Sequence, residues 1–142
     1  MKTALLDVNV LLALAWPNHQ HHDLARAWFA GEAASGWATT GGTQLAFVRL
    51  SSNPAYTDRA VPPSEAAQLL AAWIAHPHHR FWTMPPAADP SFYGMAIGHG
   101  QVNDAYLVEV ARANSGSLVT FDRRLAIHDR GREVVRVLEQ VP

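Results

Sequence analysis

The sequence predicts an α/β protein, in which one parallel sheet of about five strands lies between layers of helices. Short apolar runs of strand length alternate along the chain with longer stretches whose apolar residues recur at helical spacing. Two of the short runs end at an aspartate, and the carboxyl ends of buried parallel strands are where ligands bind in open α/β sheets. A length of 142 residues suits one hydrophobic core, so we expect a single domain over residues 1–142.

The first half of the chain opens with an apolar run that has the length of a buried strand and ends at Asp7. The helix that follows is broken by Pro17, and a second helix leads into another strand, which residues 41–42, both glycine, are expected to end. The turn-forming residues 52–54 stop a third helix, and Ser64 starts a fourth one. The expected strands cover residues 4–6 and 36–40, and the expected helices cover residues 8–15, 18–34, 43–51 and 64–75.

The second half of the chain continues the alternation. One apolar run precedes the turn-forming pair Pro85-Pro86, and another is stopped by Asp122. Asn103 is the expected N-cap of a helix whose apolar residues face one side, and Gly116 follows the end of that helix. The expected strands cover residues 81–84, 118–121 and 134–138, and the expected helices cover residues 91–98 and 103–114.

Three carboxylates occupy equivalent places in this architecture. Asp7 and Asp122 end strands, and Asp104 begins a helix. Because strand carboxyl ends and the amino ends of the following helices share one edge of a parallel sheet, we expect the three to converge. Their mutual repulsion would be relieved by a divalent cation, and oxygen ligands suit Mg²⁺ or Mn²⁺. Such a site suits hydrolysis of a phosphodiester. The simpler interpretation is that Asp7 and Asn9 only cap the next helix.

Composition limits the other possibilities. The chain has no cysteine, so a disulfide framework and a thiolate metal site are both excluded. Its N-terminal apolar run ends at residues 16–17, too short to span a bilayer, and no signal-peptide pattern precedes it, so we expect a cytoplasmic protein without membrane contact. With a formal net charge of −1, nucleic acid would have to bind at a local patch. The eight histidines fit polar positions at helix boundaries better than a metal site.

Four blocks of the sequence, in this order and spacing, resemble the PIN-domain ribonuclease toxins of the VapC type. The blocks are residues 5–11, residues 43–49 with 52–54, residues 101–107 and residues 118–123. The resemblance covers nearly the whole chain. It implies a PIN-like α/β/α fold, cleavage of RNA with Mg²⁺ or Mn²⁺, and neutralisation by a small cognate antitoxin.

The resemblance also implies roles for particular residues. It makes Asp7, Asp104 and Asp122 the metal-binding, catalytic carboxylates, with Asn9 as polar support, and Thr120 stands where a small hydroxyl residue often accompanies the last acid. The sequence departs from the family at residue 44. Many PIN domains carry a glutamate in the middle block, and Gln44 adds no negative charge there, which puts the number of bound metals in question.

Two arginines close to these blocks, Arg49 and Arg123, are candidates to hold the RNA backbone, and ordinary surface charge is the alternative for each. Helices rich in apolar and aromatic residues suggest a homodimer contact or an antitoxin groove, with burial in the core as the alternative. The residues concerned are Leu11, Leu14, Trp16, Leu24 and Trp28.

Two other functions remain open. Gln44 makes a non-catalytic PIN-like domain that binds RNA or protein conceivable. An aspartate-nucleophile phosphatase could begin with Asp7 at a strand end, although its chemistry needs a second aspartate two residues later, where Asn9 stands.

Overall fold

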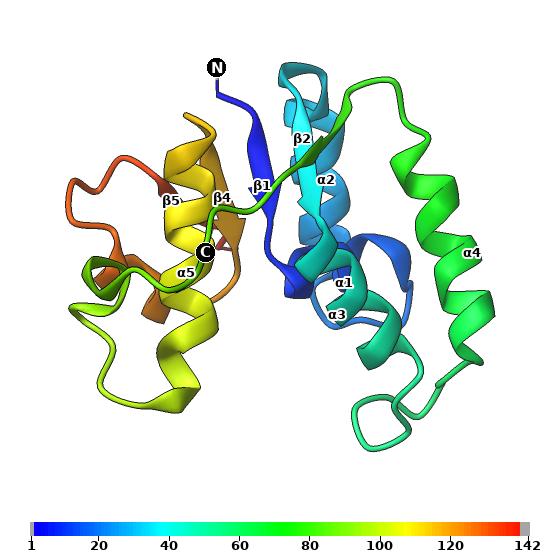
Figure 1. Ribbon diagram of the computed structural model, residues 1–142. Coiled ribbons are helices and arrows are strands. Elements are labelled where there is room, and N and C mark those ends of the chain that lie inside the picture. The colour runs from blue at the N-terminus through cyan, green and yellow to red at the C-terminus, as the bar shows by residue number, and fades with distance from the viewer. Residues whose placement is uncertain (1, 140–142) are drawn as a thin grey trace.

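A computed structural model describes residues 2–139 and shows an all-parallel five-stranded sheet with the strand order β3-β2-β1-β4-β5 (Figure 1). Helices α1 to α4 pack on one face of the sheet, and α5 and the 3₁₀ helix η4 pack on the other. The strands are β1 Ala4–Leu6, β2 Trp37–Thr40, β3 His79–Trp82, β4 Ser117–Thr120 and β5 Val135–Val137. The α-helices are α1 Val8–Ala15, α2 His22–Glu32, α3 Gly41–Ser51, α4 Pro63–Ile74 and α5 Val102–Ala113. The 3₁₀ helices are η1 Ala33–Ser35, η2 Pro90–Tyr93, η3 His99–Gln101 and η4 Arg123–His128.

The central strand β1 shows how the sequence sets the layers. Ala4 and Leu6 contribute to the core under α1 to α4, while Leu5 points to the core under α5, as the two-residue period of a strand requires. All three side chains are buried because β1 has a strand on each side and helices on both faces. The predicted three-layer class with about five parallel strands is confirmed.

Several predicted boundaries are wrong. Residues 41–42 do not end β2 but form the first turn of α3, because Thr40 caps this helix in a reciprocal pair of hydrogen bonds with Thr43. Helix α5 begins at Val102, so Asn103 lies in its first turn and does not cap it. The other differences are that α2 begins at residue 22, that β3 covers residues 79–82, and that the expected helix over residues 91–98 is replaced by the short 3₁₀ helix η2 at Pro90–Tyr93.

The expected apolar interface over the first two helices is also wrong in its main part. Leu11, Leu14 and Trp28 are buried in the core between α1, α2 and the sheet, and Trp16 and Leu24 are partly buried. The indole N–H of Trp16 donates a hydrogen bond to Ser51 Oγ, which fixes this ring against α3. Within residues 2–139, no helix has the length and apolar character needed to cross a membrane.

Candidate active site

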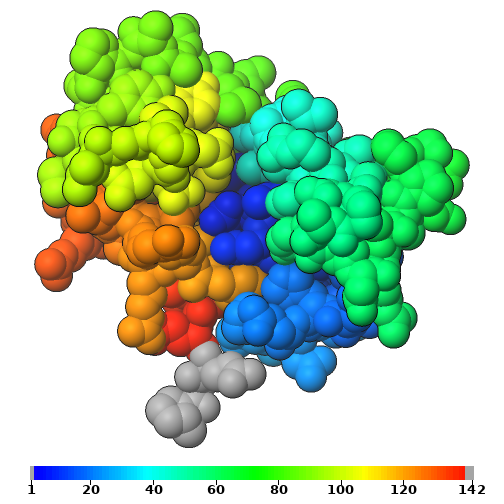
Figure 2. Space-filling model, turned by 90° about the horizontal axis from the view of Figure 1, so that it is seen from below, coloured from blue at the N-terminus to red at the C-terminus, as the bar shows by residue number. Residues whose placement is uncertain are grey.

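The site lies at the carboxyl edge of the two central strands. Asp7 follows β1 directly, Asp122 lies two residues beyond β4, and Asp104 is in the first turn of α5. The backbone N–H of Asp7 donates to the carbonyl of Val119 at 2.9 Å, so the strand pairing itself positions the carboxylate. Figure 2 looks onto this edge, where the blue N-terminal segment forms a floor between the teal residues of α3 and the yellow-green residues that lead into α5.

The hydroxyl of Thr120 joins three elements of the predicted site. It donates to Asp7 Oδ2 at 2.8 Å, and it accepts from the backbone N–H of Asp122 at 3.0 Å and from Asn9 Nδ2 at 3.4 Å. Thr120 is fully buried, so its oxygen holds these groups without competition from solvent. The other oxygen of Asp7, Oδ1, accepts from the backbone N–H of Val8 at 2.7 Å at the start of α1. Asp7 is therefore both a helix cap and a member of the cluster.

Burial and like charge act together on two of the carboxylates. Burial raises the pKa of Asp7 above its usual range, and the charges of Asp104 and Asp122 add to that effect, although the hydrogen bonds from Thr120 and Val8 oppose it. Burial also raises the pKa of Asp104, the charge of Asp122 adds to it, and His128 and Arg124 lower it. The three carboxylates are thus close enough for the charge of one to raise the pKa of another, as the sequence predicted.

The third carboxylate is compensated by a neighbour that the sequence analysis missed. Arg124 binds Asp122 through both oxygens, with Nε–Oδ1 at 3.0 Å and Nη2–Oδ2 at 2.8 Å. This hydrogen-bonded ion pair lowers the pKa of Asp122 below its usual range. An arginine two residues after an acid at a strand end was the signal available in the sequence, but its side-chain direction follows from the start of η4, where Asp122 also accepts from the Arg124 backbone N–H at 2.9 Å.

The residues of this cluster fit a hard divalent cation. Their donor atoms are all oxygens, and Asn9 Oδ1 is buried without a hydrogen-bond partner in the part of the chain that the structure describes. The side chains are not assembled as a finished ligand set: over residues 2–139, no group of three His, Cys, Asp or Glu side chains is close enough to hold one ion. Asp122 is held by Arg124, and Asp7 by Thr120 and Val8. To bind a metal, each carboxylate oxygen would have to release its present hydrogen-bond donor or accept from that donor and bind the metal at the same time.

A hollow of about 260 Å³ borders Asp7 between α3 and α5. Arg49, the candidate for holding the RNA backbone, lines it. Thr43 and Asn103 supply further polar groups, and Leu45 and Met84 supply apolar ones. The hollow is therefore a partly apolar recess that opens directly beside Asp7.

Two predicted site residues point elsewhere. Gln44 Nε2 donates to the Thr39 hydroxyl at 2.9 Å, and its side chain lines a groove toward α4 on the other side of α3 from Asp7. The guanidinium of Arg123 pairs with Glu139 at 2.7 Å and does not join Asp122. In both cases the predicted segment borders the site, but the direction of the side chain depends on where the helix begins.

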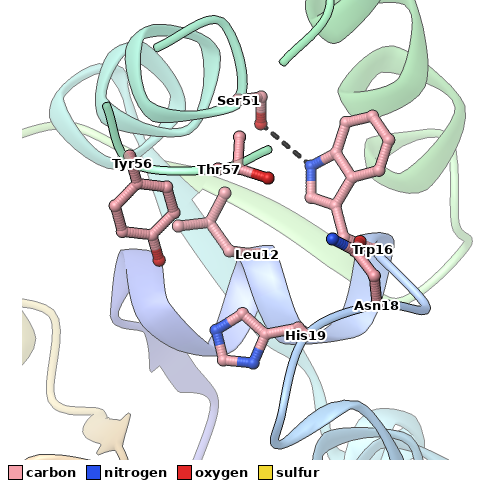
Figure 3. A pocket seen from close by; sticks show the side chains of 7 residues that line it. All are labelled: Leu12, Trp16, Asn18, His19, Ser51, Tyr56 and Thr57. Carbon is pink, nitrogen blue, oxygen red and sulfur yellow. Dashed lines mark hydrogen bonds between the residues drawn. The ribbon is translucent and has the colours of Figure 1, made fainter. Parts of the chain in front are cut away.

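A second pocket lies between the α1–α2 turn and the α3–α4 loop (Figure 3). It is about 40 Å³ in volume, room for a few water molecules. Its lining includes Leu12, Trp16, His19 and Tyr56 but no carboxylate. It is therefore too small and too poor in charge to be the catalytic centre.

Comparison with known proteins agrees with this geometry. The family profile described as PIN domain matches residues 4–131. Ribonuclease VapC39 of Mycobacterium tuberculosis is 43% identical over 130 residues, covering 87% of this chain and 91% of that protein, and Ribonuclease VapC38 of the same organism is 42% identical over 119 residues, covering 84% of each. The solved structure of VapBC2 from Rickettsia felis, bound to a DNA fragment from their promoter, superposes with a TM-score of 0.64 at 13% identity, covering 96% of this chain and 99% of that one. PAE2754 from Pyrobaculum aerophilum superposes with a TM-score of 0.60 at 23% identity, covering 94% and 83%.

Proposed function

The chain belongs to the PIN domain family, and from that membership we propose that it is the ribonuclease toxin of a type II toxin–antitoxin pair. It hydrolyses phosphodiester bonds of RNA with Mg²⁺ or Mn²⁺, and residues 1–142 act as one PIN-like domain. Sequence identity of 38 to 43% with several VapC ribonucleases, over more than four fifths of the chain, supports the activity. The proposal also includes two partners: the chain binds a cognate antitoxin, and it forms a homodimer.

The observation that carries the proposal is the convergence of Asp7, Asp104 and Asp122 at one sheet edge beside an open hollow. These three carboxylates, with Asn9 beside them, would hold the cation. When bound, the cation supplies Lewis acidity toward the phosphate and lowers the pKa of an attacking water. Gln44 takes no part, because its amide is engaged by Thr39.

The chain's own residues supply position and charge. The Thr120 hydroxyl holds Asp7 in one orientation, so this carboxylate loses little freedom on meeting the cation. Arg49, on the wall of the hollow, is placed to hold a phosphate of the RNA backbone. Arg124 neutralises Asp122, and its exposed guanidinium lies at the same edge, where it could also meet a phosphate of the RNA.

The test is cleavage of single-stranded RNA by the full chain. We expect cleavage with Mg²⁺ or Mn²⁺ and none with excess EDTA. Asp7→Asn and Asp104→Asn should each lower the rate by about a hundredfold or more, the scale seen when a group acting on the transition state is removed. Asp58→Asn, an exposed loop aspartate, is the matched control and should cut like the parent.

Three outcomes would contradict the proposal. Full cleavage in EDTA would exclude the metal mechanism, and an Asp104→Asn variant as fast as the parent would exclude that residue. RNA that is bound but left unchanged in Mn²⁺ would point to the alternative, a PIN domain that binds RNA without cutting it.

A further inference from the structure

The hollow beside Asp7 has fixed walls. Met84 packs over the first turn of α3, where a Cβ added at Gly42 would lie 3.3 Å from Met84 Cε and 3.4 Å from its sulfur. The next residue is tied to the opposite wall, because the Tyr106 hydroxyl of α5 donates to the Pro85 carbonyl. The segment of residues 84–85 therefore bridges α3 and α5, so the hollow between them is already formed in the free protein.

The apolar groups on these walls are accessible. Leu45 is 65% exposed and Met84 is 37% exposed, although both are large hydrophobic side chains. They flank one recess that also contains Asp7, so they lie beside the catalytic edge and not on a distant surface. Two accessible apolar side chains facing one slot suit a flat ligand that is inserted between them.

The polar groups at the rim have no partner in the described part of the chain. Asn103 and Arg49 are both exposed, and neither makes a side-chain hydrogen bond or ion pair within residues 2–139. Asn103 carries one donor group and one acceptor group, which match the edge of a nucleobase, whereas Arg49 offers only donors and suits a phosphate or a base carbonyl. Their chemistry is complementary to one nucleotide, with its base inside and its phosphate toward Arg49.

We propose that this hollow is a nucleobase subsite, which takes one unstacked base of single-stranded RNA next to the bond that is cut. The inference rests on the proposed ribonuclease function and adds a sequence preference to it. The volume of the hollow, about 260 Å³, lies just below the range of about 300 to 1,000 Å³ that holds drug-sized ligands. This size suits a single base, which is smaller than such a ligand. Met84 and Leu45 contact the faces of the base, and Asn103 reads its edge.

The experiment compares oligoribonucleotides that carry each of the four bases, or an abasic nucleotide, at every position around the cut. Affinity is measured by fluorescence anisotropy in EDTA, where no cutting is expected, and cleavage rates are measured in Mn²⁺. For the parent we expect one position beside the cut at which loss of the base lowers affinity and rate about tenfold or more, the scale of stacking one base. At every other position the loss should change both values much less.

Variants then assign that position to the hollow. Met84→Ala should bind base-containing and abasic RNA about equally, and Asn103→Asp, which replaces the donor by an acceptor, should change the preferred base. Ile127→Ala removes an exposed apolar side chain from η4, outside the hollow, and should behave like the parent. Melting temperatures close to that of the parent would show that the variants fold.

The outcomes separate the two proposals. Cutting that depends on Asp7 but is indifferent to every base and to Met84 would overturn the subsite and leave the ribonuclease standing. Base-dependent binding that is lost in Met84→Ala, without any cutting, would support the subsite and overturn the activity. A parent that neither binds nor cuts any oligonucleotide of the panel would overturn both.

Discussion

At the scale of single residues, the site depends on how each carboxylate is compensated. Asp7 is buried and shares its neighbourhood with two other acids, Asp104 is partly buried beside Asp122, and only Asp122 has its own arginine. The three aspartates therefore make different contributions to the stability of the metal-free protein, although they serve one proposed function.

We expect Asp7→Asn and Asp104→Asn to raise the melting temperature of the metal-free protein at neutral pH. The folded-state pKa of each group is raised, so each favours folding at low pH and loses that contribution as the pH rises through the folded pKa. An uncharged amide removes the free-energy cost of keeping an ionised carboxylate at this place in the folded protein. A gain of about 1 kcal/mol in the free energy of unfolding would raise the melting temperature by several degrees. Asp122→Asn breaks the pair with Arg124 and should not stabilise. Thermal unfolding in EDTA measures all three, and a stabilised Asp122→Asn variant would contradict this view.

The Gln44→Glu variant should leave metal binding unchanged. Its carboxylate would lie beside Thr39 and His79, whose Nε2 is 2.7 Å from the Thr39 hydroxyl, and not beside Asp7. The Mn²⁺ concentration for half-maximal cleavage should therefore equal that of the parent and that of Gln68→Glu, which adds the same charge on the exposed side of α4. A lower midpoint for Gln44→Glu alone would mean that the side chain reaches the carboxylates.

Sequence reasoning located the site where the strand pattern determines the position. Asp7 and Thr120 sit at the ends of short buried strands, so their position followed from strand length and from the shared sheet edge. Gln44 and Arg123 begin or follow helical turns, where a shift of one residue turns a side chain by about 100°. Helix α3 begins at Gly41, two residues before the predicted start, with Thr40 as its cap, and the Gln44 amide turns to Thr39 instead of the carboxylates.

At the scale of elements, one carboxylate holds the start of the edge strand β5, which also pairs with β4 along its length. Asp129 Oδ2 accepts from the backbone N–H groups of Val134 and Val135 at 2.8 Å each, and Arg112 Nη2 lies 3.6 Å from its Oδ1. Neither the composition nor the periodicity of the sequence indicated this role, because a buried acid in a turn looks like an exposed one until the fold closes over it. Arg112 also pairs with Glu109 on the same helix, where its Nε lies 3.4 Å from Glu109 Oε2.

Asp129→Asn should destabilise the fold by about 1 to 3 kcal/mol at neutral pH, the scale of hydrogen bonds to a buried charged group. Burial alone would raise the pKa of Asp129, but the backbone donors of residues 133–135 outweigh it and lower the pKa. The stabilisation is therefore present above the unfolded pKa of about 3.9 and is lost as the pH falls through the folded value. Urea unfolding at several pH values should show the parent and variant converging in acid. Asp58→Asn is the control, and a difference that persists unchanged in acid would contradict the assignment.

At the scale of the whole molecule, none of the large exposed apolar side chains within residues 2–139 lies on the first two helices. Ile97, in the segment before α5, is 91% exposed, and Val102, the first residue of α5, is 44% exposed. The expected homodimer contact must therefore be sought there and not over Leu11, Leu14 and Trp28, which the core already uses.

We expect the protein to sediment as a dimer at micromolar concentration and Ile97→Asp to sediment as a monomer. A carboxylate at the centre of an apolar contact would remain unpaired on association, whereas at a free surface it costs nothing. The melting temperature of a diluted, monomeric sample should be the same for parent and variant. A parent that stays monomeric at high concentration would remove the homodimer, and a variant that stays dimeric would place the contact elsewhere.

The strand order also has a consequence for the timing of synthesis. Strand β1 leaves the ribosome well before its partner β4 and the acid Asp122, which lie more than a hundred residues further along the sequence. At the usual elongation rates of about 5 to 20 residues per second, roughly 6 to 23 seconds separate the two ends of the site. During that interval the nascent chain lacks Thr120 and the last carboxylate. A protein that cuts RNA would therefore be harmless to the messenger and the ribosome that are producing it until the segment that carries Thr120 and Asp122 has been made.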